Sequence, residues 1–157
     1  MDRLSPAHRS LIMSRIRSRD TRPEQFVRRR IWSQGFRYAR SPRDLPGTPD
    51  LILPHYKVAI FVHGCFWHAH NCPRGRPPST NLEFWRVKLA ANKRRDRRVM
   101  RQLRSLGWRC FQIWQCRLQV DTQRVISRLK SIRVVGSRAE QILAGKNRVA
   151  KSRRSSA

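Results

Sequence analysis

The sequence predicts an α/β protein, because segments with helical spacing of apolar residues alternate along the chain with short apolar runs typical of strands. LIL at 51–53 and VAIFVH at 58–63 are separated only by the turn PHYK, which predicts a β-hairpin. WRCFQIW at 108–114 predicts a third strand, and segments 22–34 and 81–106 predict helices. A chain of 157 residues is long enough for one domain with a sizeable core and too short for two domains of ordinary size.

The first predicted helix has a start signal and a stop signal. Thr21 and Glu24 have the spacing of a capping box, in which each side chain bonds to the other's backbone N–H. Val27 and Ile31 continue at helical spacing, and Gly35 is a natural C-terminal stop.

The second predicted helix has one apolar face that includes two polar residues. Seven residues recur at alternating spacings of three and four and therefore share a face: Trp85, Leu89, Asn92, Asp96, Val99, Leu103 and Leu106. A carboxylate on the buried side of a helix costs several kcal/mol unless it is paired. We therefore expect Asp96 to meet a cation or a histidine.

The charge of the chain indicates a polyanionic partner. There are 36 Lys and Arg against 9 Asp and Glu, a formal net charge of +27, which favours nucleic acid. An anionic membrane is the weaker alternative, because no run approaches transmembrane length and the basic residues are spread over the chain. The charged start, MDRLSPAHRS, lacks the apolar core of a secretion signal, so we expect a reducing cytoplasm and free thiols.

The chain divides by composition into three parts. Residues 1–20 predict a basic N-terminal arm that lies against phosphates, and 21–133 predict the folded domain, closed by a helix at 118–132. Residues 134–157, rich in Ser, Arg and Lys, predict a disordered basic tail.

The stretch FVHGCFWHAHNCP, at 61–73, has the residue types of a metal site. Cys65, His70 and Cys72 fit one half of a tetrahedral zinc site, and Cys116, after the third predicted strand, can close it. The alternative is that these cysteines are small core residues, as most free cysteines are. We favour that alternative only for Cys110, which lies inside an apolar strand.

The remaining histidines and acidic residues suggest a catalytic site. His63 and His68 are left free beside the expected zinc ligands, and Asp96 is a candidate partner, although single histidines are more often structural. Asp50 starts the first hairpin strand and lies across from 61–63, but it also suits a turn before a strand. Glu24 is explained by capping, yet it shares a face with Val27, so both interpretations stay open.

Phe66 and Trp67 form an aromatic pair within the same loop. Most Phe and Trp side chains belong to a core. In a basic protein, an exposed aromatic pair beside a hydrolytic site can instead stack on bases or wedge between them.

Together these motifs resemble the very short patch repair endonucleases, bacterial enzymes that nick DNA beside T:G mismatches left by deamination of 5-methylcytosine. The match runs from about Met13 to Cys116, and its most specific part is HGCFWHAHNC followed by WQC. The resemblance implies a core like that of the type II restriction endonucleases, with a mixed β-sheet flanked by helices and a structural zinc. It also implies magnesium-dependent nicking of mismatched double-stranded DNA in repair, by a cytoplasmic protein that we expect to be a monomer.

The resemblance also implies roles for single residues. Asp50 would bind the catalytic magnesium, and Val62, which stands where the best-known member has threonine, would offer only its backbone carbonyl. His68 would be the general base, hydrogen-bonded to Asp96, with His63 beside the scissile phosphate. These histidines would replace the acidic residue and lysine that restriction-type nucleases usually place on the second hairpin strand.

Three further assignments follow from the resemblance. Glu24 matches an acidic residue near the site. The zinc ligands would be Cys65, His70, Cys72 and Cys116. The residues that intercalate beside the mismatch would be Met13, Phe66 and Trp67.

Two other functions stay open at this point. A non-catalytic zinc module that binds nucleic acid would need neither Asp50 nor a buried Asp96, which is why it ranks behind. A related nuclease with another substrate is also compatible with the sequence. Base context and repair partners do not follow from residue types, since base readout depends on loop geometry.

Overall fold

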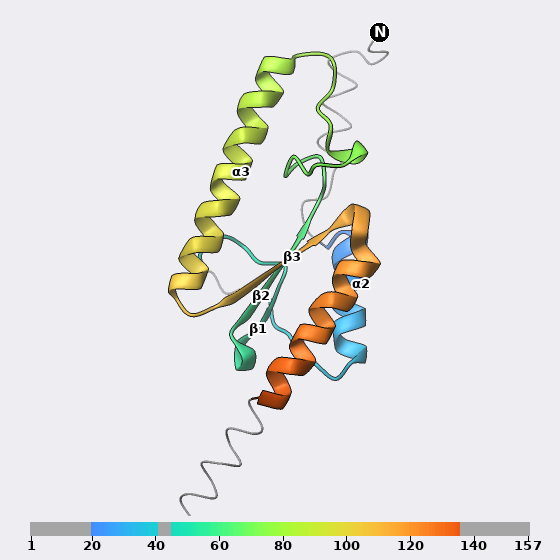
Figure 1. The fold of residues 1–157 in the computed structure, drawn as a ribbon, viewed down its shortest axis with the longest axis vertical. Coiled ribbons are helices and arrows are strands. Elements are labelled where there is room, and N and C mark those ends of the chain that lie inside the picture. The colour runs from blue at the N-terminus through green and yellow to red at the C-terminus, as the bar shows by residue number, and fades with distance from the viewer. Residues whose placement is uncertain (1–19, 41–44, 136–157) are drawn as a thin grey trace, which may run out of the picture. The chain divides into compact units, whose positions relative to one another are not determined.

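The computed structural model describes residues 20–40 and 45–135 (Figure 1). Residues 1–19, which are most of the predicted basic arm and include Met13, lie outside the described residues. Residues 136–157, which are most of the predicted tail, also lie outside them. The helices and strands are α2 (Arg22–Ser33), β1 (Leu51–Leu53), β2 (Val58–His63), α3 (Leu82–Ser105), β3 (Arg109–Trp114) and a helix over 118–135. Single 3₁₀ turns occupy Pro54–Tyr56, Pro73–Gly75 and Gln115–Arg117.

The chain divides into two compact units, 1–122 and 123–157. The described part of the second unit, 123–135, is helical, and its buried residues are Val125, Ile126 and Leu129. This helix runs to 135 and so exceeds the predicted end at 132. The sheet, α2 and α3 all belong to the first unit.

The sheet has three strands in the order β1-β2-β3 and is mixed. β1 and β2 are antiparallel, with Leu51 opposite Ile60, which confirms the predicted hairpin. β3 pairs with β2 in parallel, from Val58 opposite Arg109 to His63 opposite Trp114. The carboxyl ends of β2 and β3 therefore lie side by side, and the segments that follow them begin at the same place.

Helix α2 begins and ends as its sequence predicts. The Thr21 hydroxyl oxygen caps the helix start by accepting from the Glu24 N–H over 3.5 Å, and the same hydroxyl donates to Glu24 Oε1 over 2.7 Å. After the helix, Gly35 has φ 78°, a left-handed conformation that glycine adopts without a steric penalty, and its N–H donates to the carbonyl of Trp32. Val27 and Ile31 are fully buried.

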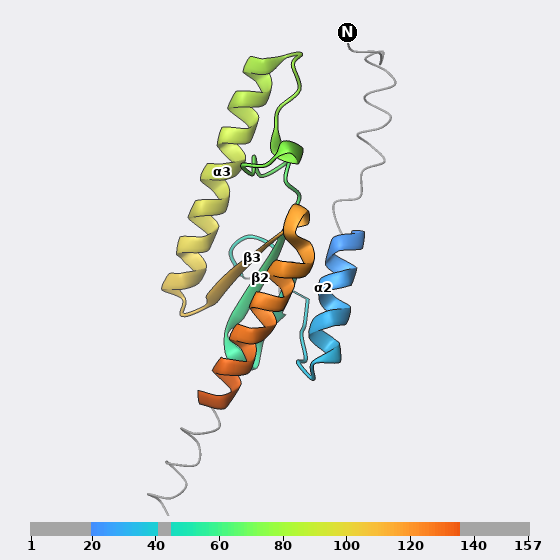
Figure 2. The same cartoon turned by 45° about the vertical axis from the view of Figure 1, so that its right-hand side comes forward.

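Helix α3 packs against one face of the sheet, and α2 lies on the opposite side in both views (Figure 1, Figure 2). Leu103 of α3 meets Ile52 and Ala59 in a buried cluster, with Val99 and Cys110 packed around it. Since successive strand residues point to opposite faces, this leaves a second buried set for the other face: Leu51, Leu53, Val58 and Ile60. Cys110 is thus a core residue, as predicted.

One member of the predicted apolar stripe is exposed, whereas the other six are buried or partly buried. Leu106 is 54% exposed, so the prediction for this residue is wrong. Helix α3 already ends at Ser105, and Gly107, with φ 80°, turns the chain toward β3 before the stripe completes another turn. No helix in the described ranges, 20–40 and 45–135, is long and apolar enough to cross a membrane.

The packing predicts a large cost for truncating Leu103. Leu103→Ala should lower the free energy of unfolding by about 2–5 kcal/mol, because the side chain is fully buried between α3 and the sheet. Leu106→Ala, on an exposed residue of the same type, should change it by about 0.5 kcal/mol or less. Urea unfolding of both variants measures the difference, and equal losses would contradict the described packing.

Candidate active site and metal centre

The loop that follows β2 has a defined backbone conformation. The His70 N–H donates to the Cys65 carbonyl over 2.9 Å, and the Cys72 N–H donates to the His70 carbonyl over 2.8 Å. Ala69 has φ 44°, which closes the turn in the left-handed region. These hydrogen bonds fold residues 64–72 back on themselves at the end of β2, next to the turn that follows β3.

Four side chains with the predicted zinc-ligand chemistry meet there. The ligand atoms of Cys65, His70, Cys72 and Cys116 all lie within 4.8 Å of one another. Cys116 Sγ, in the turn after β3, is 3.4 Å from His70 Nδ1 in the loop after β2. Three sulfurs and one imidazole nitrogen are a donor set that suits zinc, whose structural sites are four-coordinate and tetrahedral. The residues therefore fit the predicted metal, and no position is left for water.

Two neighbours shape this cluster without supplying a ligand. A Cβ on Gly75 would lie 2.0 Å from the His70 carbonyl oxygen, so only glycine fits at this point behind the loop. The imidazole of His70 stacks on the Trp114 ring, with centroids 4.1 Å apart and planes 20° apart. Neither residue was predicted as part of the site. No sequence signal marks Gly75, since the close approach of the His70 carbonyl arises only in the fold.

The cysteines of the cluster differ in how readily they ionise. Burial raises the pKa of Cys65 to about 11. Burial also raises the pKa of Cys72, but hydrogen bonds from His70 and Cys65 outweigh it and leave that pKa at about 7. Since the thiolate is the metal-binding form, Cys72 is available near neutral pH, while Cys65 must lose its proton as metal binds.

A second group brings the two remaining histidines of the loop region to Asp96. His68 Nδ1 is 2.5 Å from Asp96 Oδ2, and both side chains are mostly buried. His63, from the end of β2, stacks on His68 with ring centroids 3.8 Å apart and planes 6° apart. The pairing of Asp96 with a histidine, expected from its place on the apolar stripe, is confirmed.

The hydrogen bonds of this group determine which nitrogen of His68 is free to react. A carboxylate only accepts, so Nδ1 of His68 carries the proton and, in the neutral ring, Nε2 keeps its lone pair. Burial, and then the charge of His68, lower the pKa of His63 to about 4. His63 is therefore neutral near pH 7. The group thus holds one oriented base and one neutral imidazole stacked upon it.

The two polar residues of the α3 stripe both hold the loop. Asn92 Nδ2 donates to the Trp67 carbonyl over 2.8 Å, and Asp96 binds His68 one turn further along. Arg95 lies 3.8 Å from the other oxygen of Asp96. The polar interruptions of an otherwise apolar face are therefore explained by the loop that they support.

A third group surrounds Asp50 at the start of β1. The Val62 N–H donates to Asp50 Oδ2 over 2.7 Å, which places this carboxylate across from β2, as predicted. Arg28 reaches Glu24 Oε2 at 3.2 Å and also pairs with Asp20. Its Nη2 is 3.5 Å from the Asp50 carbonyl. Glu24 is thus both a capping residue and a neighbour of Asp50; Arg28 was not predicted, although its spacing to Glu24 is that of a helical ion pair.

The Asp50 carboxyl does not ionise as an exposed aspartate would. Burial raises its pKa to about 6, and the charge of Glu24 adds to the increase. The hydrogen bond from Val62 and the charge of Arg28 act in the opposite direction but do not cancel it. A single carboxylate of this kind suits magnesium, which binds to proteins through one or two carboxylates and keeps several waters. The residues therefore fit the predicted catalytic metal.

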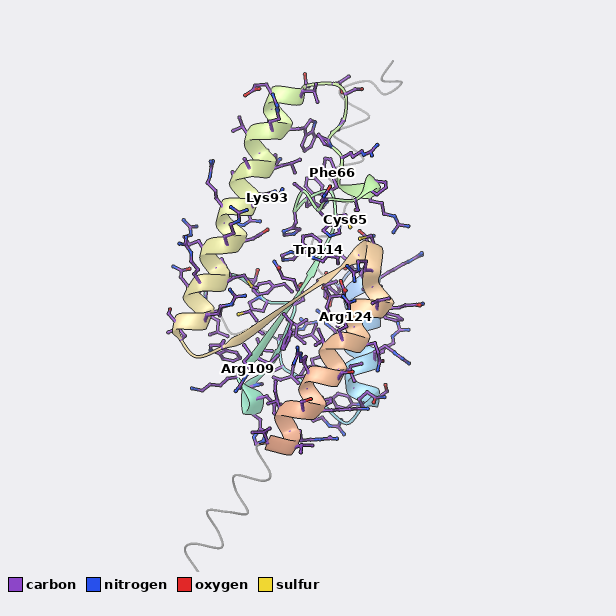
Figure 3. All side chains as sticks on the ribbon, in the orientation of Figure 1. Cys65, Phe66, Lys93, Arg109, Trp114 and Arg124 are labelled. Carbon is purple, nitrogen blue, oxygen red and sulfur yellow. The ribbon has the colours of Figure 1, made fainter. Side chains whose placement is uncertain are left out.

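Phe66 and Trp67 lie beyond the ends of the strands and form an aromatic cluster with a residue that was not predicted. Each ring lies within 6.3 Å of Trp85 from the start of α3, and the Phe66 and Trp85 centroids are 5.0 Å apart. Figure 3 shows Cys65 and Phe66 beyond the strand end that carries Trp114. Phe66 and Trp67 are partly exposed. Trp85 was expected only as a member of the apolar stripe; its position next to Phe84 is the signal that could have singled it out.

The fold and the site define a class of protein: an α/β domain in which a histidine–aspartate pair and a Cys/His metal-type cluster meet at the carboxyl end of a mixed sheet. A family model described as DNA mismatch endonuclease Vsr matches residues 1–74.

Three relatives cover most of the chain. The type II nicking enzyme V.XorIIP of Xanthomonas oryzae pv. oryzae is 44% identical over 131 residues, which are 83% of this chain and 96% of that protein. The type II nicking enzyme V.NmeAIP of Neisseria meningitidis is 37% identical over 75% of this chain and 84% of its own length. The DNA mismatch endonuclease Vsr of Escherichia coli is 41% identical over 72% of each chain.

The chain belongs to the Vsr family of DNA mismatch endonucleases. It is an endonuclease of DNA mismatch repair, as the resemblance of its motifs predicted.

The cluster geometry predicts that losing Cys116 removes both the metal and the fold around it. Cys116→Ala should leave purified protein with no bound zinc and a lower melting temperature, because it removes one of four ligands that lie within 4.8 Å. Cys110→Ala should retain the full zinc content, since Cys110 packs in the core. Metal analysis and thermal unfolding test both variants. Unchanged zinc in Cys116→Ala would remove this assignment.

The environment of Asp50 predicts a variant that is more stable than the parent. The folded-state pKa of about 6 exceeds the ordinary value of 3.8, so the folded protein loses stability as pH rises through this window. Without added metal, Asp50→Asn should therefore raise the free energy of unfolding at pH 8, and the gain should shrink toward pH 5. Urea unfolding across this range measures it. A constant gain, or a loss at pH 8, would contradict the assigned environment.

Proposed function

We propose that the protein nicks one strand of duplex DNA beside a T:G mismatch by magnesium-dependent hydrolysis of a phosphodiester. The observation that carries this proposal is the His68–Asp96 pair at the carboxyl end of the sheet. The partly buried carboxylate of Asp50, bound to the Val62 N–H of the same hairpin, adds the acidic group. The names of the relatives, a DNA mismatch endonuclease and nicking enzymes, support the mismatch and the single-strand cut.

The core is restriction-endonuclease-like in this proposal. Its support is a hairpin that carries an acidic residue at the start of β1, a third strand, and helices on both sides of the sheet. The positions on β2 where such nucleases usually carry an acid and a lysine are Phe61 and His63 here. The histidine group then supplies the chemistry that those residues would supply.

Each residue of the site has a role in the reaction. Magnesium, when bound, supplies positive charge for the phosphoryl oxygens and lowers the pKa of water. Asp50 holds it through the carboxylate that Val62 orients. His68 accepts the proton of the attacking water at Nε2, and Asp96 keeps the ring in the required tautomer and stabilises the imidazolium that forms.

Three neighbours support this chemistry. His63, neutral and stacked on His68, lies beside the scissile phosphate as a hydrogen-bonding partner. Glu24 adds negative charge next to Asp50. Cys65, His70, Cys72 and Cys116 would hold zinc in a structural role, since these ligands come from the loop after β2 and the turn after β3.

Recognition of the mismatch falls to aromatic residues and charge. Phe66 and Trp67 enter the base stack, with Trp85 behind them as part of the same cluster. Met13, in the N-terminal arm outside the described residues, takes part in this intercalation. The partner is double-stranded DNA. The net charge of +27 attracts the protein to the DNA backbone without regard to base sequence.

A nicking assay on a matched pair of duplexes tests the function. A duplex with one T:G pair should be cut in one strand with magnesium and left intact with chelator, while the T:A duplex of the same sequence should be cut far more slowly. Cutting of both duplexes at equal rates would favour a nuclease of other specificity. Binding without any cutting would favour a non-catalytic zinc module.

Asp50 should separate catalysis from binding. Asp50→Ala should abolish nicking at saturating DNA yet bind the duplex as well as the parent or better, because a negative charge leaves a site that faces a polyanion. If Asp50 only shapes the start of β1, activity should instead fall in proportion to the folded fraction. Turnover measured on protein verified as folded, with magnesium titrated, decides between these outcomes.

Trp67 should act on DNA and contribute little to the core. Trp67→Ala should weaken binding of the mismatched duplex by about 1–3 kcal/mol, the usual contribution of stacking on one base, with a small change in melting temperature. Trp32→Ala serves as a control, because it removes a half-exposed tryptophan from the end of α2. A large loss of stability in Trp67→Ala would assign the ring to the core.

A further inference from the structure

Helix α3 carries a set of exposed cations that the catalytic site does not use. Among the described residues, seven of its lysines and arginines are exposed and form no ion pair with an acidic side chain and no contact over an aromatic ring: Arg86, Lys93, Arg94, Arg97, Arg98, Arg101 and Arg104. The other two differ, because Arg95 lies near Asp96 and Lys88 lies over the rings of Phe84 and Trp85. The seven are therefore available to an external partner.

The spacing of these cations destabilises helix α3. Residues three or four apart are neighbours on a helix surface, and like charges at that spacing are destabilising. Lys93 and Arg97 have this spacing, as do Arg97 and Arg101, and Arg101 and Arg104 follow at three. A local arrangement that opposes folding is expected where it serves a function. A polyanion that lies against the helix would relieve this repulsion.

The cations are concentrated on one flank. At about 100° per residue, Arg86, Lys93, Arg97 and Arg104 project at roughly 60–100° from Asp96, with Arg101 a little further round. This flank adjoins the face that holds the catalytic loop through Asn92 and Asp96. A duplex placed with a phosphate at His68 can therefore continue along the flank without leaving the site.

The five cations on this flank, Arg86, Lys93, Arg97, Arg101 and Arg104, form a row along the helix. The length of this row suits DNA. Residues 86 and 104 are 18 positions apart, about 27 Å at 1.5 Å per residue. That length corresponds to about 8 base pairs of B-form DNA at 3.4 Å each. Its members are four arginines and one lysine, and arginine matches phosphate geometry through paired N–H donors.

We propose that Arg86, Lys93, Arg97, Arg101 and Arg104 form a phosphate-binding surface that holds the duplex on one side of the nick. The proposal deepens the proposed function and rests on it, since it assigns the same substrate a second contact. The surface binds the backbone of double-stranded DNA without reading its sequence. It contributes to affinity and to the placement of the duplex, and takes no part in the hydrolysis.

The test compares two matched pairs of substitutions. Lys93→Gln with Arg97→Gln removes two charges from the row. Lys57→Gln with Arg109→Gln removes a lysine and an arginine, both exposed, at the start of β2 and β3, the end of the sheet opposite the site. Lys93 and Arg109 are far apart in the view of Figure 3. The net charge changes equally in both variants.

The readout is binding of T:G and T:A duplexes without magnesium over a range of salt concentrations. The slope of log K against log salt should fall by about two for the row variant, because two phosphate contacts are lost, and should change little for the control. Both duplexes should be affected equally. The melting temperature of the row variant should stay the same or rise, since repulsion within α3 is reduced.

Three results would overturn the proposal: an unchanged slope in the row variant, an equal fall in the control, or a loss of nicking at saturating DNA. Either of the first two results would mean that the five cations attract DNA only through the overall charge of the protein. The third would place these cations in the catalytic machinery. Because binding is measured without cutting, a protein that cuts no duplex but shows the predicted slopes would contradict the proposed function and leave the surface standing.

Discussion

The candidate site depends on the parallel pairing of β2 with β3. The register sets His63 beside Trp114 at the last rung, so the loop that follows one strand and the turn that follows the other begin next to each other. Cys65 and Cys116 are 51 positions apart in sequence and belong to one cluster for this reason. A shift of the pairing by one residue would turn His63 to the other face and separate the ligands.

The long helix α3 supports this arrangement from one side. Its second half is fixed to the sheet by Val99 and Leu103, which gives the first half a defined direction. Asn92 and Asp96 then contact the loop at Trp67 and His68. Apolar packing places the helix, and from that position Asn92 holds the loop backbone while Asp96 orients the imidazole of His68. The same helix presents its cations on the neighbouring flank, so core packing, the proposed catalytic pair and the proposed DNA contact share a single element.

At the sites where we propose function, burial and neighbouring charges disfavour the ionised forms of Asp50 and His63. Burial keeps the pKa of Asp50 near 6 although a carboxylate is needed there, and Glu24 adds repulsion. The pKa of His63 is lowered to about 4, so this ring is held neutral. Arg28 offsets part of the cost at Asp50 through its charge. Such groups are typical of sites whose geometry matters more than their contribution to stability.

Much of this organisation could be predicted from the sequence, and the exceptions have physical reasons. The hairpin, both helices and the pairing of Asp96 with a histidine follow from local spacing and from the cost of burying a charge. Gly75 could not be recognised, because its need for a missing Cβ arises from the approach of His70 in three dimensions. Trp85 was assigned to the core by periodicity, which cannot distinguish packing against the sheet from packing against a loop.

Leu106 and Arg28 show two further limits of sequence patterns. The stripe predicts burial for Leu106, but a pattern does not reveal where a turn takes the chain away from the sheet. Arg28 has an ordinary helical ion-pair spacing to Glu24, and only the fold places it near Asp50. Sequence patterns therefore predict which chemical groups the site contains better than they predict which residues surround each group in the fold.

The central claim is that His68 and Asp96 act as one catalytic unit, and a double-mutant cycle tests it most directly. Nicking rates at saturating DNA are compared for the parent, His68→Ala, Asp96→Asn and the double variant, each verified as folded. The account predicts that His68→Ala loses about 10²–10⁴-fold and that adding Asp96→Asn causes little further loss, because the carboxylate acts through the imidazole. Losses that multiply in the double variant would show that the two residues act independently and would contradict the account.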